Sequence, residues 1–448
     1  PLPNGAIDAR SYALPVLCFE KTTGISDFLK EAGLANHCVA HYLDTSDMAN
    51  KVLELASSPR LLKDVGSRCK TASARYFNLK SYVNKLVSIA ENACAKTQQE
   101  QADVQTILSS QLYRQDFACP PHVQDFSIEM EVRNYVRAWA SGIGRRKPLP
   151  GFNPGIYEEQ NGSALKNSDP FADYLRKGQP EGPWSYPVIV SNNLAITGEE
   201  ARVSPASAQR VALHLHVYYC DLLPEILARL TQNEIRPDLF ISVTTDDARQ
   251  EVAQALEAYT GRVAEIVVAP NCGRDIGPFL TEFGHTLLAN YDIIGHLHTK
   301  KTVDLADSAV GRVWYKFLLE NLLGSQSSPM ADTIVGKLQQ DPSIGLVFPD
   351  DPNIVGLDGN REYLAELAQR LGPLSSEEYF AFPVGTMFWA RAEALAPLIN
   401  LNLSWDDYPK EPLPYDGSML HALERLFGLS LPLSNLRFAS TNVIGITR

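Results

Sequence analysis

The sequence predicts an α/β protein whose C-terminal part contains a mostly parallel sheet flanked by helices. Of the 448 residues, 45% are hydrophobic and 21% are charged, a composition typical of globular proteins with a buried core. From about residue 208 onward, strand-like and helix-like segments alternate regularly. The opening of the chain shows the same strand-then-helix pattern. The length allows two or three domains.

Changes in pattern divide the chain into three parts. Residues 1–97 hold two strand-like runs and several helix patterns, which predict an incomplete Rossmann-like α/β segment. The polar run 96–101 lies at the junction with the second part, residues 98–207, and we interpret it as a linker. Residues 98–207 then hold one helix pattern and many prolines and glycines, which predict a connector with fixed turns and no core. Residues 208–448 predict the main domain. The chain begins at Pro1 within an apparent motif, so we expect a fragment of a longer protein.

The expected elements follow in chain order. Strands are expected at residues 14–19, 39–43, 211–219, 239–245, 263–269, 292–298, 344–349 and 386–391. Helices are expected at residues 27–32, 46–57, 59–77, 79–95, 127–141, from 222, and at 248–259, 276–288, 310–323, 332–340, 362–371 and 418–427. Ligands of such sheets bind at the carboxyl ends of the strands, where most of the motifs described below fall.

Charge and cysteine content restrict the class of protein. The chain carries 40 Lys+Arg against 52 Asp+Glu, which argues against nucleic acid as a partner. Seven cysteines occur singly, without a CxxC pair, and this predicts reduced thiols in a cytoplasmic protein. No apolar stretch is long enough to span a membrane.

A basic stretch with interleaved aromatic residues lies in the connector. It consists of Arg133, Tyr135, Arg137, Trp139, Arg145, Arg146 and Lys147. One interpretation is a short amphipathic helix in peripheral contact with the inner, cytoplasmic membrane surface. The other, which we favour, is a solvated helix face beside a loop.

A glycine-containing turn follows the expected strand at 263–269. Gly273 lies between this strand and the next helix, where backbone N–H groups are available to a phosphate, and Arg274 adds a bidentate donor. This pattern predicts an anion site. The alternative is that Asp275 caps the helix while Arg274 forms a surface ion pair.

Two pairs of histidines lie on expected strands. His296 and His298 are two residues apart and project from the same face, and His214 and His216 repeat this arrangement. If the two strands are neighbours, four imidazoles approach one another at the ligand edge, a spacing compatible with a divalent metal. The alternative, which we favour, is that buried histidines hydrogen-bond one another or the backbone.

A third cluster lies near the C-terminus. Asp416 is in a loop before a helix that carries His421, Glu424 and Arg425. Glu424 and His421 are three residues apart on one helix face, so they are able to form an acid and imidazole pair. A general base requires a carboxylate at the edge of a pocket. Asp416 is either such a general base or the N-cap of the helix, and the sequence leaves both interpretations open.

Five motifs together resemble the rhamnan synthesis protein F family, over residues 208–448. They are residues 214–219, 271–279, 296–301, 385–389 and 416–425. The resemblance implies transfer of rhamnose, or a related deoxyhexose or pentose, to a growing cell-surface polysaccharide such as a capsule or the O-antigen of lipopolysaccharide. Residues 8–16, 24, 42–44 and 75–78 resemble the end of the donor-binding half of GT-B retaining glycosyltransferases. We interpret residues 1–97 as a structural or docking remnant.

The order of elements after residue 208 resembles the GT-A nucleotide-sugar fold. The resemblance implies that Asp246 contacts the nucleobase or ribose, that Asp275 lies at the nucleotide, and that residues 296–298 occupy the place of the Asp-x-Asp metal motif. Because hard cations prefer oxygen ligands, no metal is predicted to be required, although His296 and His298 remain a candidate site for a divalent metal.

The implied reaction is an inverting transfer from a nucleotide-sugar donor. Asp416 acts as the general base, with His421 and Glu424 beside it, while Arg274 and Lys300 neutralise the diphosphate. The nucleotide-sugar site is expected to comprise His214, His216, Asp246, Asn271, Gly273, Arg274, Asp275, His296, His298 and Lys300. Expected partners are the donor, a lipid-linked or glycan acceptor and other polysaccharide-assembly enzymes. The alternative function is a non-catalytic module that binds glycan or a partner enzyme.

Overall fold

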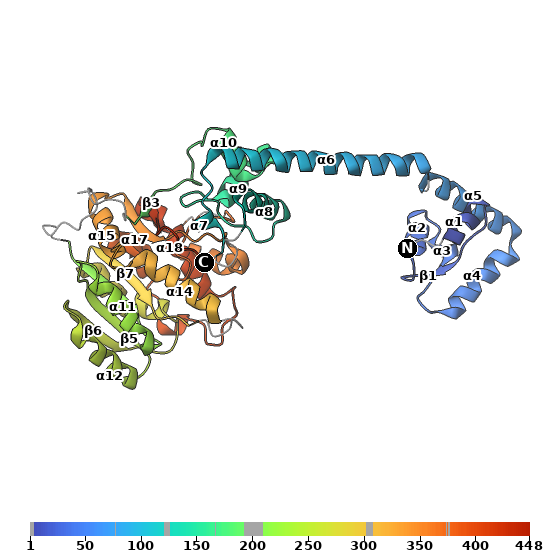
Figure 1. The fold of residues 1–448 in the computed structure, drawn as a ribbon. Coiled ribbons are helices and arrows are strands. Elements are labelled where there is room, and N and C mark those ends of the chain that lie inside the picture. Colours follow the sequence, from blue (N-terminus) through green and yellow to red (C-terminus); the bar gives the residue numbers. More distant parts are fainter. Residues whose placement is uncertain are drawn as a thin grey trace. The chain divides into compact units, whose positions relative to one another are not determined.

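The computed structural model describes residues 4–76, 78–120, 126–165, 167–191, 209–301, 308–372, 374 and 377–448. The chain forms two compact units, Pro1–Gln98 and Gln99–Arg448 (Figure 1). The expected boundary at residue 207 lies outside the described residues. Each unit has its own buried core and is described by itself.

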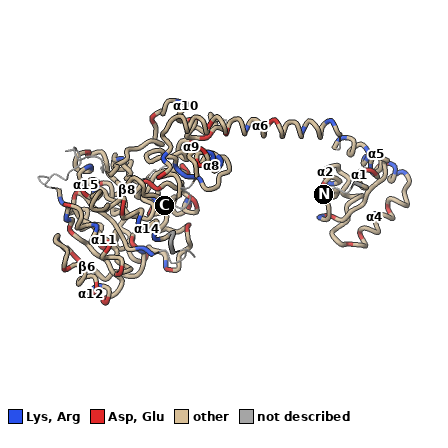
Figure 2. Tube along the Cα trace, viewed as in Figure 1, with Lys and Arg blue, Asp and Glu red and all other residues tan. Residues whose placement is uncertain are grey.

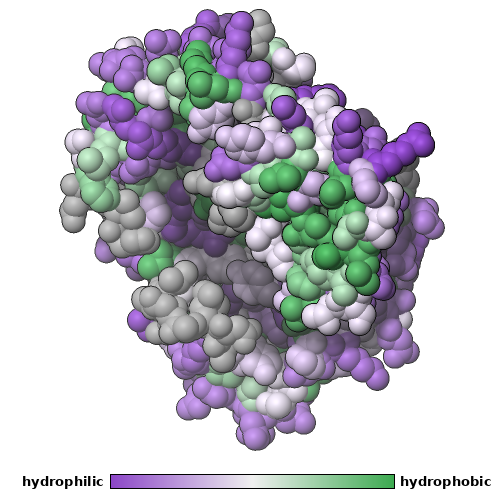
Figure 3. Space-filling model, turned by 90° about the vertical axis from the view of Figure 1, so that its right-hand side faces the viewer, coloured by the Kyte–Doolittle hydropathy of each residue, from purple (hydrophilic) through white to green (hydrophobic). Residues whose placement is uncertain are grey.

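The first unit is a small α/β fold. Its elements are α1 (Asn4–Ser11), β1 (Cys18–Phe19), α2 (Gly24–Glu31), α3 (Ala35–Cys38), β2 (Val39–Ala40), α4 (Thr45–Ser57), α5 (Pro59–Tyr76) and the first part of α6 (Leu79–Ser110). The two strands pair in parallel, and apolar side chains of α2 and α5 such as Leu29 and Val65 form the core. Large apolar side chains remain exposed in this unit, among them Tyr12 and Leu79. Figure 3 shows hydrophobic residues gathered on the molecular surface.

Helix α6 contains the polar run that we interpreted as a linker. Residues 96–101 are helical, and the boundary between the two compact units falls within them, after Gln98, so the run is a helical linker. The run contains Lys, Gln and Glu but neither Gly nor Pro, and these residues favour a helix over a flexible segment. Its side chains are polar because this part of α6 lies largely at the surface, and buried residues appear only from Asp103 onward.

The connector has a core, contrary to our expectation. It forms the helices α7 (Gln115–Ala118), α8 (Ile128–Ser141), α9 (Pro154–Leu165) and α10 (Pro170–Arg176). Aromatic residues such as Trp139, Phe152 and Phe171 are buried together between them. Proline and glycine do not prevent this, because Pro154 and Pro170 stand at helix starts, where no intrahelical N–H bond is lost.

The aromatic residues of the basic stretch belong to this core, and several of its basic residues form ion pairs. Tyr135 and Trp139 are 5% and 3% exposed, so α8 does not present the apolar face that a membrane interpretation requires. Arg137 pairs with a glutamate of α6, and Lys147 forms a buried ion pair of 2.7 Å with Asp350. Figure 2 shows residues of both charges around α8 and α9. In the described part of the chain, no helix is both long enough and apolar enough to cross a membrane.

The main domain confirms the predicted α/β class, because its eight-stranded sheet is mostly parallel and carries helices on both faces. The strand order is β3 (Val188–Val190), β10 (Arg437–Asn442), β8 (Ile344–Pro349), β9 (Phe388–Arg391), β7 (Ile293–His298), β4 (Val211–His216), β5 (Asp238–Val243) and β6 (Val263–Val268). Only β9 is antiparallel to its neighbours among the described strands. Leu213 and Leu215 face one core, while Ala212 faces the other.

Helices of the main domain cover the two faces separately. They are α11 (Leu223–Thr231), α12 (Asp246–Ala255), α13 (Gly284–Asn290), α14 (Ser308–Leu322), α15 (Met330–Gln340), α16 (Arg361–Leu371), α17 (Ala392–Ile399) and α18 (Met419–Leu429). Apolar residues of α11, α12, α14 and α15 belong to one core, and those of α13, α16, α17 and α18 belong to the other. The predicted helix at 276–288 is instead a π-helix, Pro278–Phe283, followed by α13.

The separate cores predict that the main domain and connector fold without the first 97 residues. Deleting residues 1–97 removes one core and leaves the others intact. All five tryptophans lie after residue 98, so the near-ultraviolet circular dichroism of tryptophan reports on the second unit alone. We expect the truncated protein to keep this signal and to lose it in one cooperative thermal transition. A truncated protein without such a transition would contradict the division into units.

Candidate functional site

The candidate site lies where the sheet changes its direction of winding. From β4 the chain proceeds through β5 and β6 to one edge, and β7 then returns to the other side of β4. In open α/β sheets, ligands bind at the carboxyl ends of strands at such a switch point. Thr299, just after β7, accepts hydrogen bonds of 2.9 Å from the backbone N–H groups of Tyr218 and Tyr219, which follow β4.

The four histidines meet at this switch point, as the sequence predicts for neighbouring strands. His214 pairs in register with His296, and His216 pairs with His298. All four side chains are buried, with exposed fractions of 0% for the inner pair and of 6% and 7% for His216 and His298. Because residues two apart on a strand project from the same face, and the pairs are in register, the imidazoles form one cluster near the carboxyl ends of β4 and β7.

A chain of hydrogen bonds connects most of this cluster. His296 Nε2 lies 3.3 Å from Asp275 Oδ2, and the Nδ1 atoms of His214 and His296 are 2.9 Å apart. His214 Nε2 is 3.0 Å from Ser242 Oγ, which also lies 2.9 Å from His216 Nδ1. The favoured alternative, in which buried histidines hydrogen-bond one another, describes this arrangement.

This arrangement does not fit a divalent metal at His296 and His298. Both ring nitrogens of His296 are already engaged, by His214 and by Asp275. Across the described ranges, no group of three or more His, Cys, Asp or Glu side chains has the geometry of a metal site. Metal coordination by His296 would therefore require a buried hydrogen bond to break.

Burial sets the charge state of the cluster. It lowers the pKa of His214 and His296 and lowers that of His216 to about 4. Burial also tends to raise the pKa of Asp275, but His298 and His296 outweigh this effect and hold that pKa below its usual value. At neutral pH His214, His216 and His296 are therefore neutral imidazoles beside an ionised carboxylate.

The turn before Asp275 places this carboxylate but not the other predicted ligands. Gly273 has φ +72°, and a Cβ atom there would come within 2.8 Å of the Cα of Gly277. Asp275 uses its carboxylate on His296 and does not cap the helix. Arg274 forms the surface ion pair of the alternative interpretation, 2.8 Å from Glu411, with both side chains 45% exposed.

Asn271 and Asp246 lie outside the histidine cluster. Asn271 is exposed in the turn after β6. Asp246 is exposed in the first turn of α12, whose N-cap is Thr245. Both follow strands of the parallel part of the sheet, so they lie on its carboxyl side.

Lys300 supplies the partly buried cation of the site. Its Nζ lies 3.6 Å from the ring centroid of Trp314, and the guanidinium of Arg448 lies 4.4 Å from the same centroid. Burial lowers the pKa of Lys300 to about 8, although Glu424 and Asp275 oppose this effect. The adjacent Lys301 instead forms an exposed ion pair with Asp221.

Gly385 joins the histidine cluster to the third sequence motif. His298 Nε2 donates to the carbonyl of Gly385 at 2.8 Å, and the N–H of Gly385 donates to Glu424 Oε1 at 2.6 Å. Gly385 has φ +90°, and a Cβ atom there would meet the Trp314 ring at 3.2 Å. Burial raises the pKa of Glu424. The N–H of Gly385 and the charge of Lys300 partly offset this rise.

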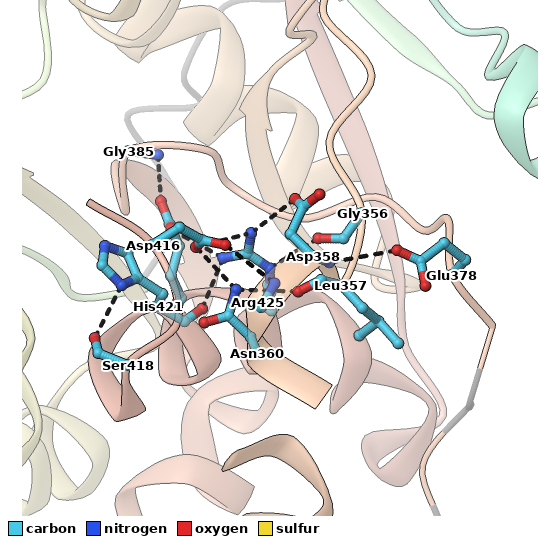
Figure 4. Close-up of polar contacts among 12 residues, drawn as sticks. Gly356, Leu357, Asp358, Asn360, Glu378, Gly385, Asp416, Ser418, His421 and Arg425 are labelled. Atoms are coloured by element: carbon cyan, nitrogen blue, oxygen red, sulfur yellow. Dashed lines mark hydrogen bonds and ion pairs between the residues drawn. The ribbon is translucent and has the colours of Figure 1, made fainter. Parts of the chain in front are cut away.

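Asp416 is held by several donors (Figure 4). It accepts hydrogen bonds from Asn360 Nδ2 at 2.9 Å and from the N–H of Gly359 at 3.2 Å, and it lies 3.5 Å from Arg425. Burial tends to raise the pKa of Asp416, but Asn360 and Arg425 hold it below the usual value. Asp416 does not cap its own helix, because Ser418 occupies the N-cap position of α18.

His421 and Glu424 do not form the acid and imidazole pair that their spacing allows. His421 Nδ1 contacts Ser418 Oγ at 2.9 Å, whereas Glu424 accepts from Gly385. Burial lowers the pKa of His421, although Asp416 opposes this effect. The two side chains thus contact different residues, although both belong to α18.

Sequence analysis gave no role to three residues of this site, Ser242, Trp314 and Gly385, although Gly385 opens one of the five motifs. Ser242 is paired in register with His216 on the adjacent strand, and a hydroxyl at the end of an apolar strand was the available signal. Trp314 and Gly385 act through a ring face and a backbone turn, for which a single sequence gives no specific pattern.

Comparison with known proteins places this site within a recognised family. The model of the family described as rhamnan synthesis protein F matches residues 175–433, more than half of the chain. Two relatives described as uncharacterized protein WxcX, from two strains of Xanthomonas campestris pv. campestris, are each 32% identical over 275 residues. The matched region is 60% of this chain but only 38% of each relative.

One solved structure is similar to part of the chain, at low sequence identity and with a low TM-score. It is core-mannan synthase A from Aspergillus fumigatus in its Mn/GDP form, 13% identical, covering 58% of this chain and 78% of that chain. The TM-score is 0.26.

Neutral His216 predicts a loss of stability in acid. The folded pKa is about 4 against an ordinary value of 6.5, so between these values the unfolded chain binds a proton that the folded chain does not. The contribution is complete above about pH 6.5, falls as pH drops toward about 4 and is on the order of 3 kcal/mol. Urea unfolding at about pH 7 and about pH 4.5 should show a smaller difference for His216→Asn than for the wild type. Equal differences would contradict the assignment.

Proposed function

We propose, from the premise that this chain belongs to the rhamnan synthesis protein F family, that its main domain is a glycosyltransferase. It transfers rhamnose, or a related deoxyhexose or pentose, from a nucleotide-sugar donor to a cell-surface polysaccharide such as capsule or O-antigen. The observation that carries this proposal is the cluster of His216, His298, Asp275 and Lys300 at the switch point of the sheet. Because the chain spans 38% of its curated relatives, the activity of a longer protein is part of the proposal.

In this proposal the donor lies across the ends of β4 and β7. Lys300 neutralises the diphosphate, since a cation held against Trp314 is already positioned and partly desolvated. Arg274 contributes only after it exchanges Glu411 for the phosphate, because the two now form an ion pair. Asp246 and Asn271 are placed for the nucleoside, at the ends of the strands beyond β4.

The acceptor is proposed to approach from the side of Gly385. A small hollow of about 20 Å³ lies beside this turn, and the residues that line it include Phe380, Phe382, Val384 and Asn153. Aromatic faces and an amide suit the apolar and polar faces of a sugar ring. The acceptor hydroxyl gives its proton to a carboxylate as its oxygen bonds to the anomeric carbon, and the nucleoside diphosphate leaves with the bonding electrons, which inverts the configuration.

Two carboxylates are candidates for the general base. Asp416, the sequence prediction, has both oxygens engaged by Asn360, Gly359 and Arg425, and its pKa is lowered. Glu424, whose side chain is 15% exposed, accepts from Gly385 and lies 3.7 Å from Arg425, and burial raises its pKa. A base is most effective when its pKa lies near the working pH, so the raised pKa supports Glu424 as the base. Asp416 then positions Arg425.

We propose a supporting role for residues 1–97 and a cytoplasmic location. This segment would dock partner enzymes of polysaccharide assembly, since its exposed apolar side chains include Leu43 and Leu53. The location is supported by all seven cysteines being free thiols. The second candidate function is a non-catalytic module that binds glycan or a partner enzyme.

A thermal-shift panel of nucleoside diphosphates and their sugars tests the proposed function. A ligand at one hundred times its dissociation constant stabilises the folded protein by about 2.7 kcal/mol. We expect one nucleotide sugar to raise the melting temperature of the wild type and of Lys301→Met, but not that of Lys300→Met. Lys301 is the matched control because its ion pair with Asp221 is exposed. No shift for any nucleotide would favour the non-catalytic module.

Paired carboxylate variants distinguish the two candidate bases. Glu424→Gln keeps an oxygen to accept from Gly385, and we expect it to lower the turnover rate by about 10²- to 10⁴-fold without weakening donor binding. Asp416→Asn is expected to lower the turnover rate less and to reduce stability by roughly 1–3 kcal/mol, because Arg425 loses an ionic partner. The opposite ranking of turnover rates would make Asp416 the base.

Donor binding is expected to be independent of divalent metal. The hydrogen bonds of His296 leave it no free nitrogen for coordination, and Lys300 supplies positive charge in place of a cation. Isothermal titration of the donor in EDTA should give a dissociation constant within a factor of about two of that with added Mn²⁺ or Mg²⁺. Binding that EDTA abolishes and Mn²⁺ restores would contradict this expectation.

A further inference from the structure

We infer that the hydrogen-bond chain from Asp275 to His216 runs in one direction only, and that it fixes His216 Nε2 and His298 Nδ1 as a pair of acceptors for ligand hydroxyl groups. The direction follows from the hydrogen-bond geometry together with an ionised Asp275 and neutral imidazoles. The identity of the ligand as the sugar or ribose of a donor rests on the proposed function.

The direction begins at Asp275. An ionised carboxylate only accepts hydrogen bonds, so His296 must donate to it from Nε2, at 3.3 Å. A neutral imidazole carries one N–H, so His296 Nδ1 has a lone pair and accepts from His214 Nδ1, at 2.9 Å. His214 then has no hydrogen on Nε2 and accepts from the hydroxyl of Ser242, at 3.0 Å.

Ser242 transmits the direction to the neighbouring strand. Its single hydrogen is used on His214, so Oγ accepts from His216 Nδ1, at 2.9 Å. The hydrogen of His216 is therefore on Nδ1, and its Nε2 carries a lone pair. Ser242 is a positioning residue, because it determines the tautomer of His216 without contacting the ligand.

His298 reaches the same state by a separate route. Its Nε2 lies 2.8 Å from the carbonyl oxygen of Gly385, which only accepts. His298 therefore carries a hydrogen on Nε2, and in the neutral form of the ring Nδ1 carries the lone pair. A reversed chain would require a cationic His296, which burial opposes.

The two residues that carry these lone pairs lie side by side at the switch point. His216 and His298 are register partners at the last residues of β4 and β7, and each retains a small exposed fraction. Within the described parts of the chain, neither His216 Nε2 nor His298 Nδ1 has a hydrogen-bond partner. Neutral acceptors suit hydroxyl groups and are unfavourable for phosphate oxygens, which need donors. The pair therefore recognises a sugar or ribose, and the phosphates lie toward Lys300.

Nitrogen-15 NMR of the full chain with labelled histidine tests the tautomers. Long-range proton–nitrogen correlations distinguish a protonated ring nitrogen from one with a lone pair. We expect protonated Nδ1 in His214 and His216 and protonated Nε2 in His296 and His298. Ser242→Ala should release the tautomer of His216 and leave that of His298 unchanged, while Ser242→Thr, which keeps the hydroxyl, should restore it. A protonated His216 Nε2 in the wild type would overturn the inference.

L-Rhamnose and pyrophosphate serve as probes of the acceptor pair. L-Rhamnose should shift the nitrogen resonances of His216 Nε2 and His298 Nδ1 in the wild type and in Ser242→Thr, and should shift that of His216 at least about threefold less in Ser242→Ala. Pyrophosphate should leave both unchanged. Shifts caused by pyrophosphate, or none with L-rhamnose, would overturn the hydroxyl assignment. These outcomes are separate from those of the nucleotide panel, whose failure would reject the proposed function and leave the tautomers as measured.

Discussion

The largely buried carboxylate of Asp275, whose side chain is 13% exposed, imposes its requirements on the site around it. Removing a carboxylate from water is costly unless hydrogen bonds and compensating charge replace its hydration. His296 meets this requirement directly, and His298 lies 3.9 Å away. The requirement explains the left-handed turn at Gly273, which brings the carboxylate under the sheet. Burial, and not the carboxylate, keeps the imidazoles of His214, His216 and His296 neutral, and the hydroxyl of Ser242 links His214 to His216.

A second constraint connects this charge to the proposed chemistry. Gly385 donates to Glu424 on one side and accepts from His298 on the other, so one backbone turn positions both side chains. Trp314 packs against this turn and against Lys300. Donor charge, sugar recognition and proton acceptance are thereby connected through few contacts. A change in any one of them is expected to alter the others, because neighbouring residues of a network do not contribute independently.

Periodic elements were predictable from sequence, and irregular ones were not. The strand Ile344–Pro349 and the end of α16 at Leu371 agree with prediction because their apolar patterns are uninterrupted. Strand β10 was missed because its sequence, RFASTN, is mostly polar, and α17 because it contains Pro397. The meeting of the histidine pairs followed from strand adjacency. The partners of Asp416 and Glu424 depend on loops between distant elements, and no local sequence pattern specifies these contacts.

The central claim is that the donor binds at the carboxyl ends of β4 and β7. Photoaffinity labelling with an azido derivative of the nucleotide sugar, followed by peptide mapping, tests it most directly. The account predicts labelled peptides from the segments that follow β4, β6 and β7, around residues 217–222, 271–275 and 299–301, with labelling suppressed by excess unmodified donor. Competable labelling confined to the opposite edge of the sheet, around Asp238 and Asp292, or to residues 1–97, would contradict it.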